Sequence, residues 1–586
     1  MRSSSFLRQL LLPTIFMVHA LFLLLASSTG AYAQTKQPIK IEGQVLDDKG
    51  TPLSGVNITI KGANSGVATD GDGNFIIDVP AENTTLVFSS IGYVTREIAV
   101  KSTTKNLSIK LQAASNTLND VVVVGYGTQK KVNLTGSVES INSARLADRP
   151  VTQLSAALQG IAPGVTVTTI TGAPGSDAGN IRIRGIGTIT NASALILIDG
   201  IEGNMNELDP NMIESISVLK DAASSAIYGS RAANGVILVT TKRAKGEKLN
   251  ITYNGYMGKQ QATNLPDKVG ALDHMSLLNI AYKNTGLTPV YTDAQIEKYS
   301  QEMTNNPDLY PNTDWQKEVL KGSGMMQNHS VGISGSSGKL RFLTSLGYLK
   351  QDGIIKTSSY ERYTLRNNAD VKFSDKVSMK MDLQLINRTT TEPGRGLENV
   401  FSQMNRIPAT QLGRLTNGKW GEGWNGNNPI AMVEDGGFNK SNTLSLQGNL
   451  QLNYKPVNWL TAELVAAPRF VNDYADKFVK AVTTYTGAGS IAFTQPAKSE
   501  KTNANGRAWY GNYRASVTAD KVFGDHSVKW LLGASKETGY STSFSAFRDN
   551  YQFPDYTVLN SGDKSNQQTS GDATDWALQS FFSRIN

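Results

Sequence analysis

Residues Leu444–Tyr454 read LSLQGNLQLNY, in which apolar and polar residues alternate up to a terminal aromatic. Residues Val377–Leu385, VSMKMDLQL, show the same alternation without a break. Successive side chains of a strand point to opposite faces of its sheet, so this period of two predicts strands with one apolar and one polar face. Such strands fit either a half-exposed sheet in water or the wall of a membrane barrel.

Further segments have the composition of strands, and the last residues of the chain resemble the middle of another, which gives about ten candidate strands. They are residues 249–258, 328–335, 339–350, 360–373, 458–470, 508–521, 527–537 and 578–586.

The connections between these strands separate the two possibilities. Residues 374–376, 455–458 and 524–526 form tight turns, whereas residues 388–442 and 471–508 are long polar excursions. Short turns on one side of a sheet and long loops on the other are typical of a transmembrane barrel. The predicted fold class is therefore mostly β, with an antiparallel transmembrane barrel in the C-terminal part.

The N-terminus predicts export. Two arginines precede an apolar run at residues 10–25, and small residues stand where signal peptidase cleaves, between Ala33 and Gln34. The apolar run is short for a membrane span of about 20 residues, which disfavours the alternative of a transmembrane anchor. Residues 1–33 are therefore predicted to be a removed signal peptide.

Composition excludes several classes of protein. The 586-residue chain is too long for one ordinary core, so several domains are expected. The chain has no cysteine, which excludes a lipid anchor on cysteine, a disulfide framework and a thiolate metal site. The net charge of +8 is spread along the chain, and without a clustered basic face nucleic-acid binding is not predicted.

Residues 38–111 are predicted to form a small β-sandwich, because short alternating runs are separated by turn residues. Asp70 and Asp72 stand in a turn that lacks the glycine and the glutamate of a calcium loop, so a plain turn is predicted there. The segment Gly43–Val100 resembles the carboxypeptidase regulatory-like domain, a seven-stranded sandwich without catalytic residues. GQV, PLSGV, TD and GNF carry this resemblance.

Residues 130–243 are predicted to form a mixed α/β unit. Its elements, in order, are a helix at 151–158, strands at 181–185 and 194–200, a helix-to-strand segment at 211–218, a capped helix at 221–229 and a strand at 234–241.

The linker at residues 112–129 contains an unusual β-branched run. It consists of Asp120, Val121, Val122, Val123, Val124, Gly125 and Tyr126. Four consecutive valines favour an extended backbone, and we see no hairpin partner for them nearby. Such a strand can pair with a strand of another protein. The alternative is that it forms the first strand of the unit that follows.

Several motifs in fixed order then carry a specific resemblance. The block Ile213–Ala222, ahead of AIYG at Ala226–Gly229 and ANGVI at Ala233–Ile237, is similar to the SusC/RagA family of TonB-dependent outer-membrane transporters. The resemblance extends from Gln34 to the end of the chain. Within the α/β unit it rests on Arg182, Arg184, Gly185, Asp199, Gly200, Glu214, Lys220, Tyr228, Gly229, Asn234 and Gly235.

This resemblance implies that residues 130–243 are a plug and that residues 244–586 begin a barrel of 22 strands. Because about ten strands cannot close such a barrel, we expect the chain to be the N-terminal portion of a longer protein. The implied location is the outer membrane of a Gram-negative bacterium, in contact with its lipid, with the N-terminal domain in the periplasm.

The implied function is import of a nutrient, an oligosaccharide (glycan) first and a peptide second. TonB, with its inner-membrane energising complex, would add a strand to Asp120–Tyr126, and the proton motive force would then displace the plug. A SusD-like surface lipoprotein is the other implied partner. A signal-transducing receptor and a non-transporting surface adhesin are the alternatives.

Two groups of residues complete the expected sites. Trp420, Trp424 and Asn425 lie in a loop whose aromatic faces and amides suit sugar rings or peptide backbones, or which simply packs on neighbouring loops. Arg182 and Arg184 either pair with acidic groups of the plug or barrel wall, or are purely structural.

No enzyme is predicted. The three histidines after the signal peptide lie in different segments, and no nucleophile elbow with plausible partners is visible. The adjacent acids Glu434 and Asp435 are interpreted as solvated or glycan-facing. No cofactor and no metal site is predicted.

Overall fold

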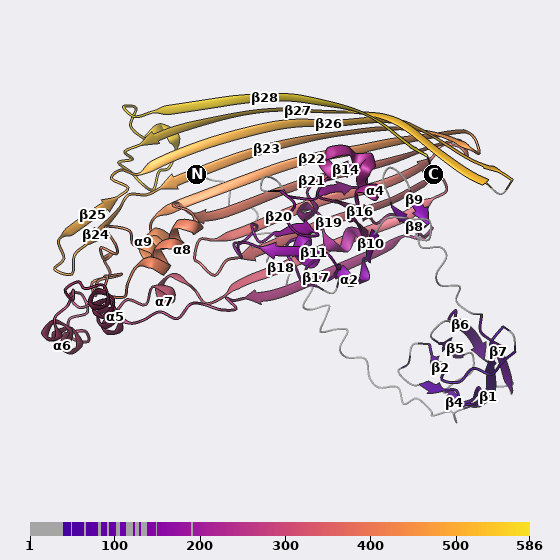
Figure 1. Cartoon of the computed structure of the whole chain (residues 1–586), viewed down its shortest axis with the longest axis horizontal. Coiled ribbons are helices and arrows are strands. Elements are labelled where there is room, and N and C mark those ends of the chain that lie inside the picture. Colours follow the sequence, from indigo (N-terminus) through magenta and orange to yellow (C-terminus); the bar gives the residue numbers. More distant parts are fainter. Residues whose placement is uncertain are drawn as a thin grey trace, which may run out of the picture. The chain divides into compact units, whose positions relative to one another are not determined.

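The computed structural model divides the chain into two compact units, Met1–Asp120 and Val121–Asn586 (Figure 1). It describes residues 39–48, 50–61, 63, 66–79, 84–90, 93–100, 106–112, 121–123, 128–130, 138–147, 149–188, 192–524 and 526–585. The predicted signal peptide lies outside these residues, as do Asp120, Val124, Gly125 and Tyr126. Across the described ranges, no helix has both the length and the apolar character needed to cross a membrane.

The first unit contains a β-sandwich with sheet orders β4-β1-β7 and β3-β2-β5-β6. Its strands are β1 (Ile39–Leu46), β2 (Asn57–Ile60), β3 (Gly66–Ala68), β4 (Asn74–Val79), β5 (Thr84–Ser89), β6 (Arg96–Val100) and β7 (Leu107–Lys110). Alternate residues of β4 are buried, so one face of each sheet forms the core, as the period of two requires. Asp70 accepts hydrogen bonds from the backbone N–H groups of Asp72 and Asn74, which makes the predicted plain turn.

Replacing Phe88 by alanine is expected to destabilise the sandwich by about 3–5 kcal/mol, because a fully buried aromatic side chain leaves a cavity. Phe88 is 0% exposed and meets the edge of Phe75 with ring centroids 5.5 Å apart. The free energy of unfolding in urea measures the effect. Ile76→Ala, at a side chain that is 52% exposed, is the matched control and should change stability little.

The second unit begins with a plug-like α/β region. A five-stranded sheet of order β10-β15-β16-β13-β14 lies beside the two-stranded sheet β11-β12. Its elements are β10 (Val138–Asn142), α2 (Ala144–Ala147), α3 (Leu154–Ala157), β11 (Val165–Thr169), β12 (Gly179–Ile183), β13 (Leu195–Ile198), β14 (Ile201–Glu202), η2 (Met205–Glu207), η3 (Pro210–Met212), β15 (Ile213–Leu219), α4 (Ala222–Ser225), η4 (Ala226–Ala232) and β16 (Val236–Thr241).

Glycine is required where this region turns back into β16. Gly235 has a φ of 87°, and a Cβ there would lie 2.6 Å from Ile183 Cδ1.

The predicted helix at 221–229 breaks at Gly229, which has a φ of 69°. The prediction of a side-chain cap is wrong. Asp221 occupies the N-cap position of α4, but its side chain makes no capping hydrogen bond.

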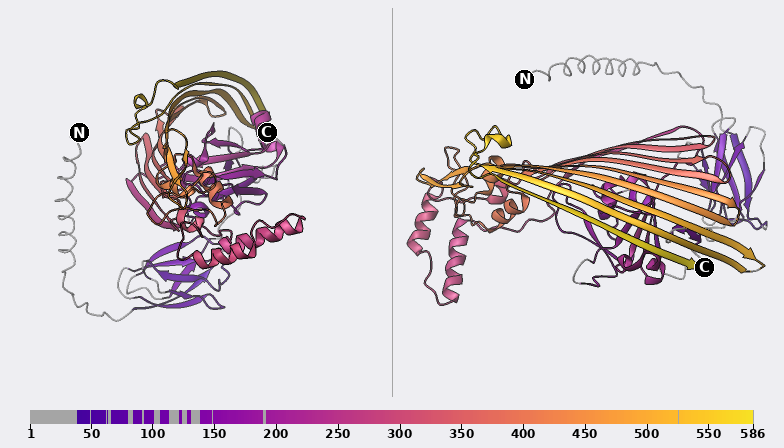
Figure 2. Two further views of the ribbon diagram at one scale, coloured as in Figure 1. Left: turned by 90° about the vertical axis from the view of Figure 1, so that its left-hand side faces the viewer. Right: turned by 90° about the horizontal axis from the view of Figure 1, so that it is seen from above.

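The remainder is one ten-stranded antiparallel meander, here called the wall, in which every strand pairs with its sequence neighbours in the sheet. Its strands are β17 (Asn250–Gln260), β18 (Gly324–Ser337), β19 (Leu340–Asp352), β20 (Ser359–Lys372), β21 (Val377–Pro393), β22 (Gly437–Val457), β23 (Leu460–Val479), β26 (Glu500–Phe523), β27 (His526–Asp549) and β28 (Gln568–Ile585). Figure 2 shows the wall curving like the side of a barrel.

The expected strands are all present, but the predicted excursions at 388–442 and 471–508 are too long. β21 continues to Pro393, β23 continues to Val479, and β26 begins at Glu500. The loops also contain helices that the sequence did not reveal. They are α5 (Ala271–Asn284), α6 (Asp293–Glu302), α7 (Trp315–Val319), α8 (Leu397–Arg406) and α9 (Pro429–Glu434).

Candidate functional site

The plug region is fastened to the wall by a buried ion pair. Asp199 follows β13 with a φ of 49°, and its carboxylate accepts a hydrogen bond from the Thr241 hydroxyl at 2.7 Å. Arg366 of β20 reaches the same carboxylate at 2.6 Å. The side chains of Arg366 and Asp199 are only 6% and 11% exposed, so neither charge is solvated. Asp199, one of the residues that carry the resemblance, therefore connects the plug to the wall.

Neutral side chains complete this connection. Arg366 also donates to Gln384 at 2.9 Å and to Asn368 at 3.1 Å, both of them wall residues. Asn368 donates in turn to the Thr241 hydroxyl and to the Lys242 carbonyl, each at 2.8 Å. Fully satisfied polar networks of this kind fix one arrangement of the elements that they join. The end of β16 is thus held against β20 and β21.

Arg243 makes a second connection directly after β16. Its guanidinium contacts Asp370 at 2.9 Å and Asp382 at 2.7 Å, on neighbouring wall strands. Burial alone would lower the pKa of Arg243, but the negative charges of Asp382, Asp370 and Asp199 raise it above its ordinary value. Sequence reasoning missed Arg243, because its partners are more than 100 residues away and nothing local marks them.

A third connection involves arginines on three wall strands. Glu207 of η2 lies 3.7 Å from Arg388 of β21 and 3.7 Å from Arg469 of β23. Arg362 of β20 donates to the neighbouring Asn206 carbonyl. Arg362, Arg388 and Arg469 are called the wall arginine cluster below. No sequence signal identified it.

Other residues that carry the family resemblance make their contacts inside the plug region. Arg184 forms an ion pair with Asp221, and Arg182 donates to the Ile181 carbonyl. Lys220 donates to the Pro163 carbonyl at 2.6 Å. Pairing of Arg184 with an acid of the plug is thus found, whereas the contact given for Arg182 is a backbone hydrogen bond.

The remaining residues that carry the family resemblance also lie in the plug region, and one of them pairs with the segment that follows β16. Glu214 pairs with Lys245 at 2.5 Å, and Asn234 donates to the Ser193 carbonyl at 3.5 Å. Tyr228 is buried in a small cluster with Leu219 and Leu238. Gly185 and Gly200 have φ values of 94° and 87°, so they serve the backbone.

The valine-rich segment has a partner within the chain, contrary to expectation. β8 (Val121–Val123) pairs antiparallel with β9 (Thr128–Lys130), so that Val122 lies opposite Gln129. The pairing is short, because each strand contributes three residues.

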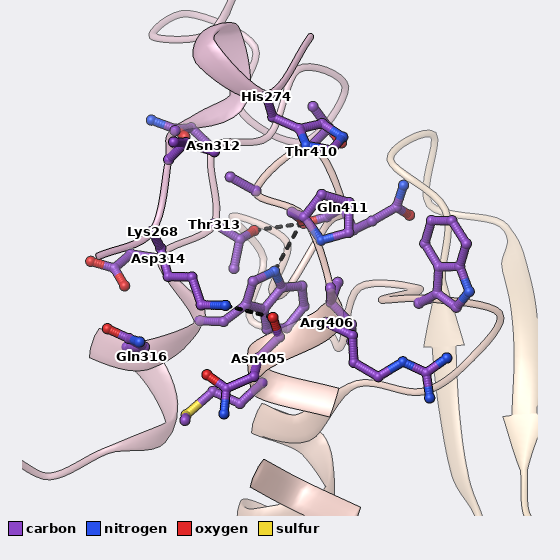
Figure 3. Close-up of a pocket in the computed structure, with 18 of the residues that line it drawn as sticks. Lys268, His274, Asn312, Thr313, Asp314, Gln316, Asn405, Arg406, Thr410 and Gln411 are labelled. Atoms are coloured by element: carbon purple, nitrogen blue, oxygen red, sulfur yellow. Dashed lines mark hydrogen bonds between the residues drawn. The ribbon is translucent and has the colours of Figure 1, made fainter. Parts of the chain in front are cut away.

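A cavity of about 1040 Å³ lies among the loops at one end of the wall. Figure 3 shows it between α5, the segment around Asn312 to Gln316, and the end of α8. Lys268 donates to the Asn405 carbonyl at 2.5 Å across this space, and Thr313 donates to the Gln411 carbonyl at 2.8 Å. The lining combines polar groups with apolar and aromatic ones such as Tyr282 and Trp424. This mixture can bind a polar molecule that also has apolar faces.

The two tryptophans of the predicted ligand loop have different surroundings. The Arg414 guanidinium lies 4.3 Å from the centre of the Trp420 ring, whose indole N–H donates to Asp435 at 3.4 Å. Trp424 is 46% exposed and lines the cavity. Asn425 has a φ of 50° and accepts a hydrogen bond from Gln495 through its carbonyl. The surroundings of Trp420 are those of a side chain that packs within the loop, whereas the exposed ring of Trp424 is placed to contact a ligand in the cavity.

Glu434 and Asp435 are bound to cations rather than simply solvated. Glu434 contacts Lys356 at 2.7 Å and Arg414 at 2.8 Å, and Asp435 contacts Lys480 at 2.6 Å. Burial acts to raise the pKa of Glu434, but hydrogen bonds from Lys356 and Arg414 outweigh it and lower that pKa. The two acids hold the loop that carries both tryptophans.

Replacing Trp424 by alanine is expected to weaken ligand binding by about tenfold or more, since truncating an interface tryptophan commonly costs 2 kcal/mol or more. Trp459→Ala is the control, because Trp459 is similarly exposed, at 43%, but stands in the turn between β22 and β23. Ligand titration of the full-length protein measures both affinities. Equal losses in the two variants would contradict a role for the cavity.

Comparison with known proteins agrees with this architecture. The family model of the TonB-dependent receptor plug domain matches residues 130–236, and that of the CarboxypepD_reg-like domain matches residues 41–123. TonB-dependent receptor P26 of Formosa agariphila is 33% identical over 568 residues, which are 94% of this chain and 53% of that protein. TonB-dependent receptor SusC of Bacteroides thetaiotaomicron is 34% identical over 386 residues, which are 64% of this chain and 36% of SusC.

The fold has a counterpart of known structure. A structure of the RagAB peptide importer in its open-open state matches with a TM-score of 0.68 at 22% identity, over 80% of this chain and 54% of that one. The chain spans about half the length, or less, of the curated relatives named here. The structural match shows the fold alone. The plug and sandwich matches and the likeness to P26 and to SusC lead to one conclusion: the chain belongs to the SusC/RagA family of TonB-dependent receptors.

Proposed function

We propose that the protein imports a nutrient across the outer membrane, with an oligosaccharide as the first candidate and a peptide as the second. The observation that carries this proposal is the way the plug region is attached to the wall. Ion pairs and hydrogen bonds make the attachment at Asp199, Glu207 and Arg243. Polar contacts can be exchanged for water when the plug moves, whereas a continuous apolar core could not be opened at similar cost.

The energy for this movement would come from TonB and its inner-membrane energising complex, driven by the proton motive force. In this proposal Asp120–Tyr126 is the segment to which TonB adds a strand, with the periplasmic sandwich preceding it. Strand addition uses backbone hydrogen bonds, so the short pairing of β8 with β9 would be exchanged for pairing with TonB. A SusD-like surface lipoprotein would cover the loop end, where the cavity beside Trp424 would take up ligand.

Uptake by cells tests this proposal. The full-length gene is deleted in its host, and accumulation of labelled oligosaccharides and peptides is compared with that in a strain lacking TonB. Both strains are expected to lose uptake of the same compound, and a plasmid copy of the gene should restore it in the first strain alone. Uptake that persists without TonB would contradict energy coupling.

A further inference from the structure

The wall arginine cluster contains a like-charge arrangement that the sheet alone does not compensate. Arg362 and Arg388 are directly opposite each other in the β20–β21 ladder, so both side chains point to the same face. Like charges in this position destabilise a sheet. Arg469 of β23 lies near Arg388, because both arginines contact Glu207 of the plug.

The plug region supplies the compensation. Glu207 contacts both Arg388 and Arg469, and the Asn206 carbonyl accepts from Arg362. Among the ion pairs of the described residues, Glu207 is the carboxylate that Arg388 and Arg469 contact. The Glu207 side chain is only 9% exposed, so its charge is stabilised by these arginines rather than by water.

The cluster has unused capacity for a further anion. The Arg469 Nε is buried and has no hydrogen-bond partner within the described residues. The side chains of Arg388 and Arg469 remain 36% and 25% exposed beside the plug. Guanidinium groups match carboxylates with paired hydrogen bonds, which makes arginine the usual residue for such recognition.

Arg514 provides a contrast within the wall, because its charge is balanced by another wall residue. Arg514 of β26 pairs with Glu463 of β23 at 2.8 Å, so movement of the plug leaves that pair intact. When η2 leaves, by contrast, the wall arginine cluster keeps three positive charges and loses Glu207. The plug carboxylate thus stands where an anionic group of a passing substrate would be stabilised.

From this geometry we propose that the wall arginine cluster binds carboxylate groups of an anionic oligomer during import, and that Glu207 occupies the site in the resting state. This inference rests on the proposed import function and names the substrate class. The shared chemistry is a chain bearing several carboxylates, which an acidic oligosaccharide or an acidic peptide can supply.

Binding to the full-length protein in detergent tests the site without TonB. Trigalacturonate, triglutamate and neutral maltotriose are titrated against the wild type and Glu207→Gln, an isosteric change that removes the competing charge. Glu207→Gln should bind at least one acidic probe about tenfold more tightly, with maltotriose unchanged. A preference for trigalacturonate identifies an acidic oligosaccharide as the substrate that supplies the carboxylates. A preference for triglutamate identifies an acidic peptide.

Arginine substitutions provide the second part of this binding test. Arg388→Gln with Arg469→Gln, added to Glu207→Gln, should abolish the gain, whereas Arg514→Gln in the same background should retain it. Thermal unfolding of each variant shows whether it is folded. Affinities for both acidic probes that stay within about twofold in Glu207→Gln, or a gain that survives loss of both arginines, overturn the inference.

The two proposals fail separately. If acidic probes bind as expected but cells take them up equally well without TonB, energy-coupled import is wrong and the anion site stands. If uptake requires TonB but Glu207→Gln leaves binding of acidic probes unchanged, the import function stands and the anion site is wrong.

Discussion

A proline in place of Val122 is expected to reduce TonB-dependent uptake to the level of a strain lacking the transporter, while ligand binding remains intact. Proline has no backbone N–H and fixes φ, so a strand that contains it loses the hydrogen bonds on which strand addition depends. Val122 lies in the middle of β8, opposite Gln129. Uptake of labelled ligand by cells and titration of the purified full-length protein measure the two quantities separately.

Val122→Thr is the matched control for this variant. Threonine is also β-branched and retains the N–H, so uptake should stay close to that of the wild type. Deletion of Asp120–Tyr126 should reproduce the proline result. Undiminished uptake in both the proline and the deletion variants would show that TonB engages another segment.

Replacing Asp199 by asparagine is expected to loosen the plug. The change leaves Arg366 buried without its counter-charge, and breaking a buried ion pair in this way costs about 3–5 kcal/mol. Asparagine tolerates the positive φ at this position, so the effect comes from the charge. Channel openings of the full-length protein in a planar bilayer should become on the order of a hundredfold more frequent or more.

Asp221→Asn makes the same chemical change at an ion pair inside the plug region. Its partner Arg184 is 53% exposed, and exposed pairs contribute about 0–1 kcal/mol, so channel opening should change little. Adding Arg366→Gln to Asp199→Asn should recover part of the loss, because no uncompensated buried charge remains. Equal leakage from Asp199→Asn and Asp221→Asn would contradict the assigned role of the Asp199–Arg366 pair.

Strands of the wall were predictable where their two faces differ in polarity. Residues Leu444–Tyr454 lie within β22, and Val377–Leu385 begin β21. The same rule misjudged strand length, because near the loop end both faces of a strand are polar and the period of two disappears. The first eight residues of β26, EKTNANGR, show no such alternation, yet they pair with β23 and β27.

The candidate sites were predictable only in part, for a related reason. Asp199 and Trp424 were selected from motif and composition, but their partners and their exposure were not visible in the sequence. The helix α6 was missed altogether, because it has no buried residues and its residues are largely polar. Weak amphipathicity gives a helix little periodic signal.

The sequence by itself predicted the order of the domains, and it determined which residues share a face of each wall strand and to which family the chain belongs. These properties follow from local patterns: alternation, turn residues and short motifs in order. Only the tertiary structure decided which charges meet. Arg243 finds Asp370 and Asp382, and Glu207 lies between Arg388 and Arg469, because the register of the meander and the position of the plug bring distant residues together. Coulombic pairing depends on distance in space, and local patterns do not encode that distance.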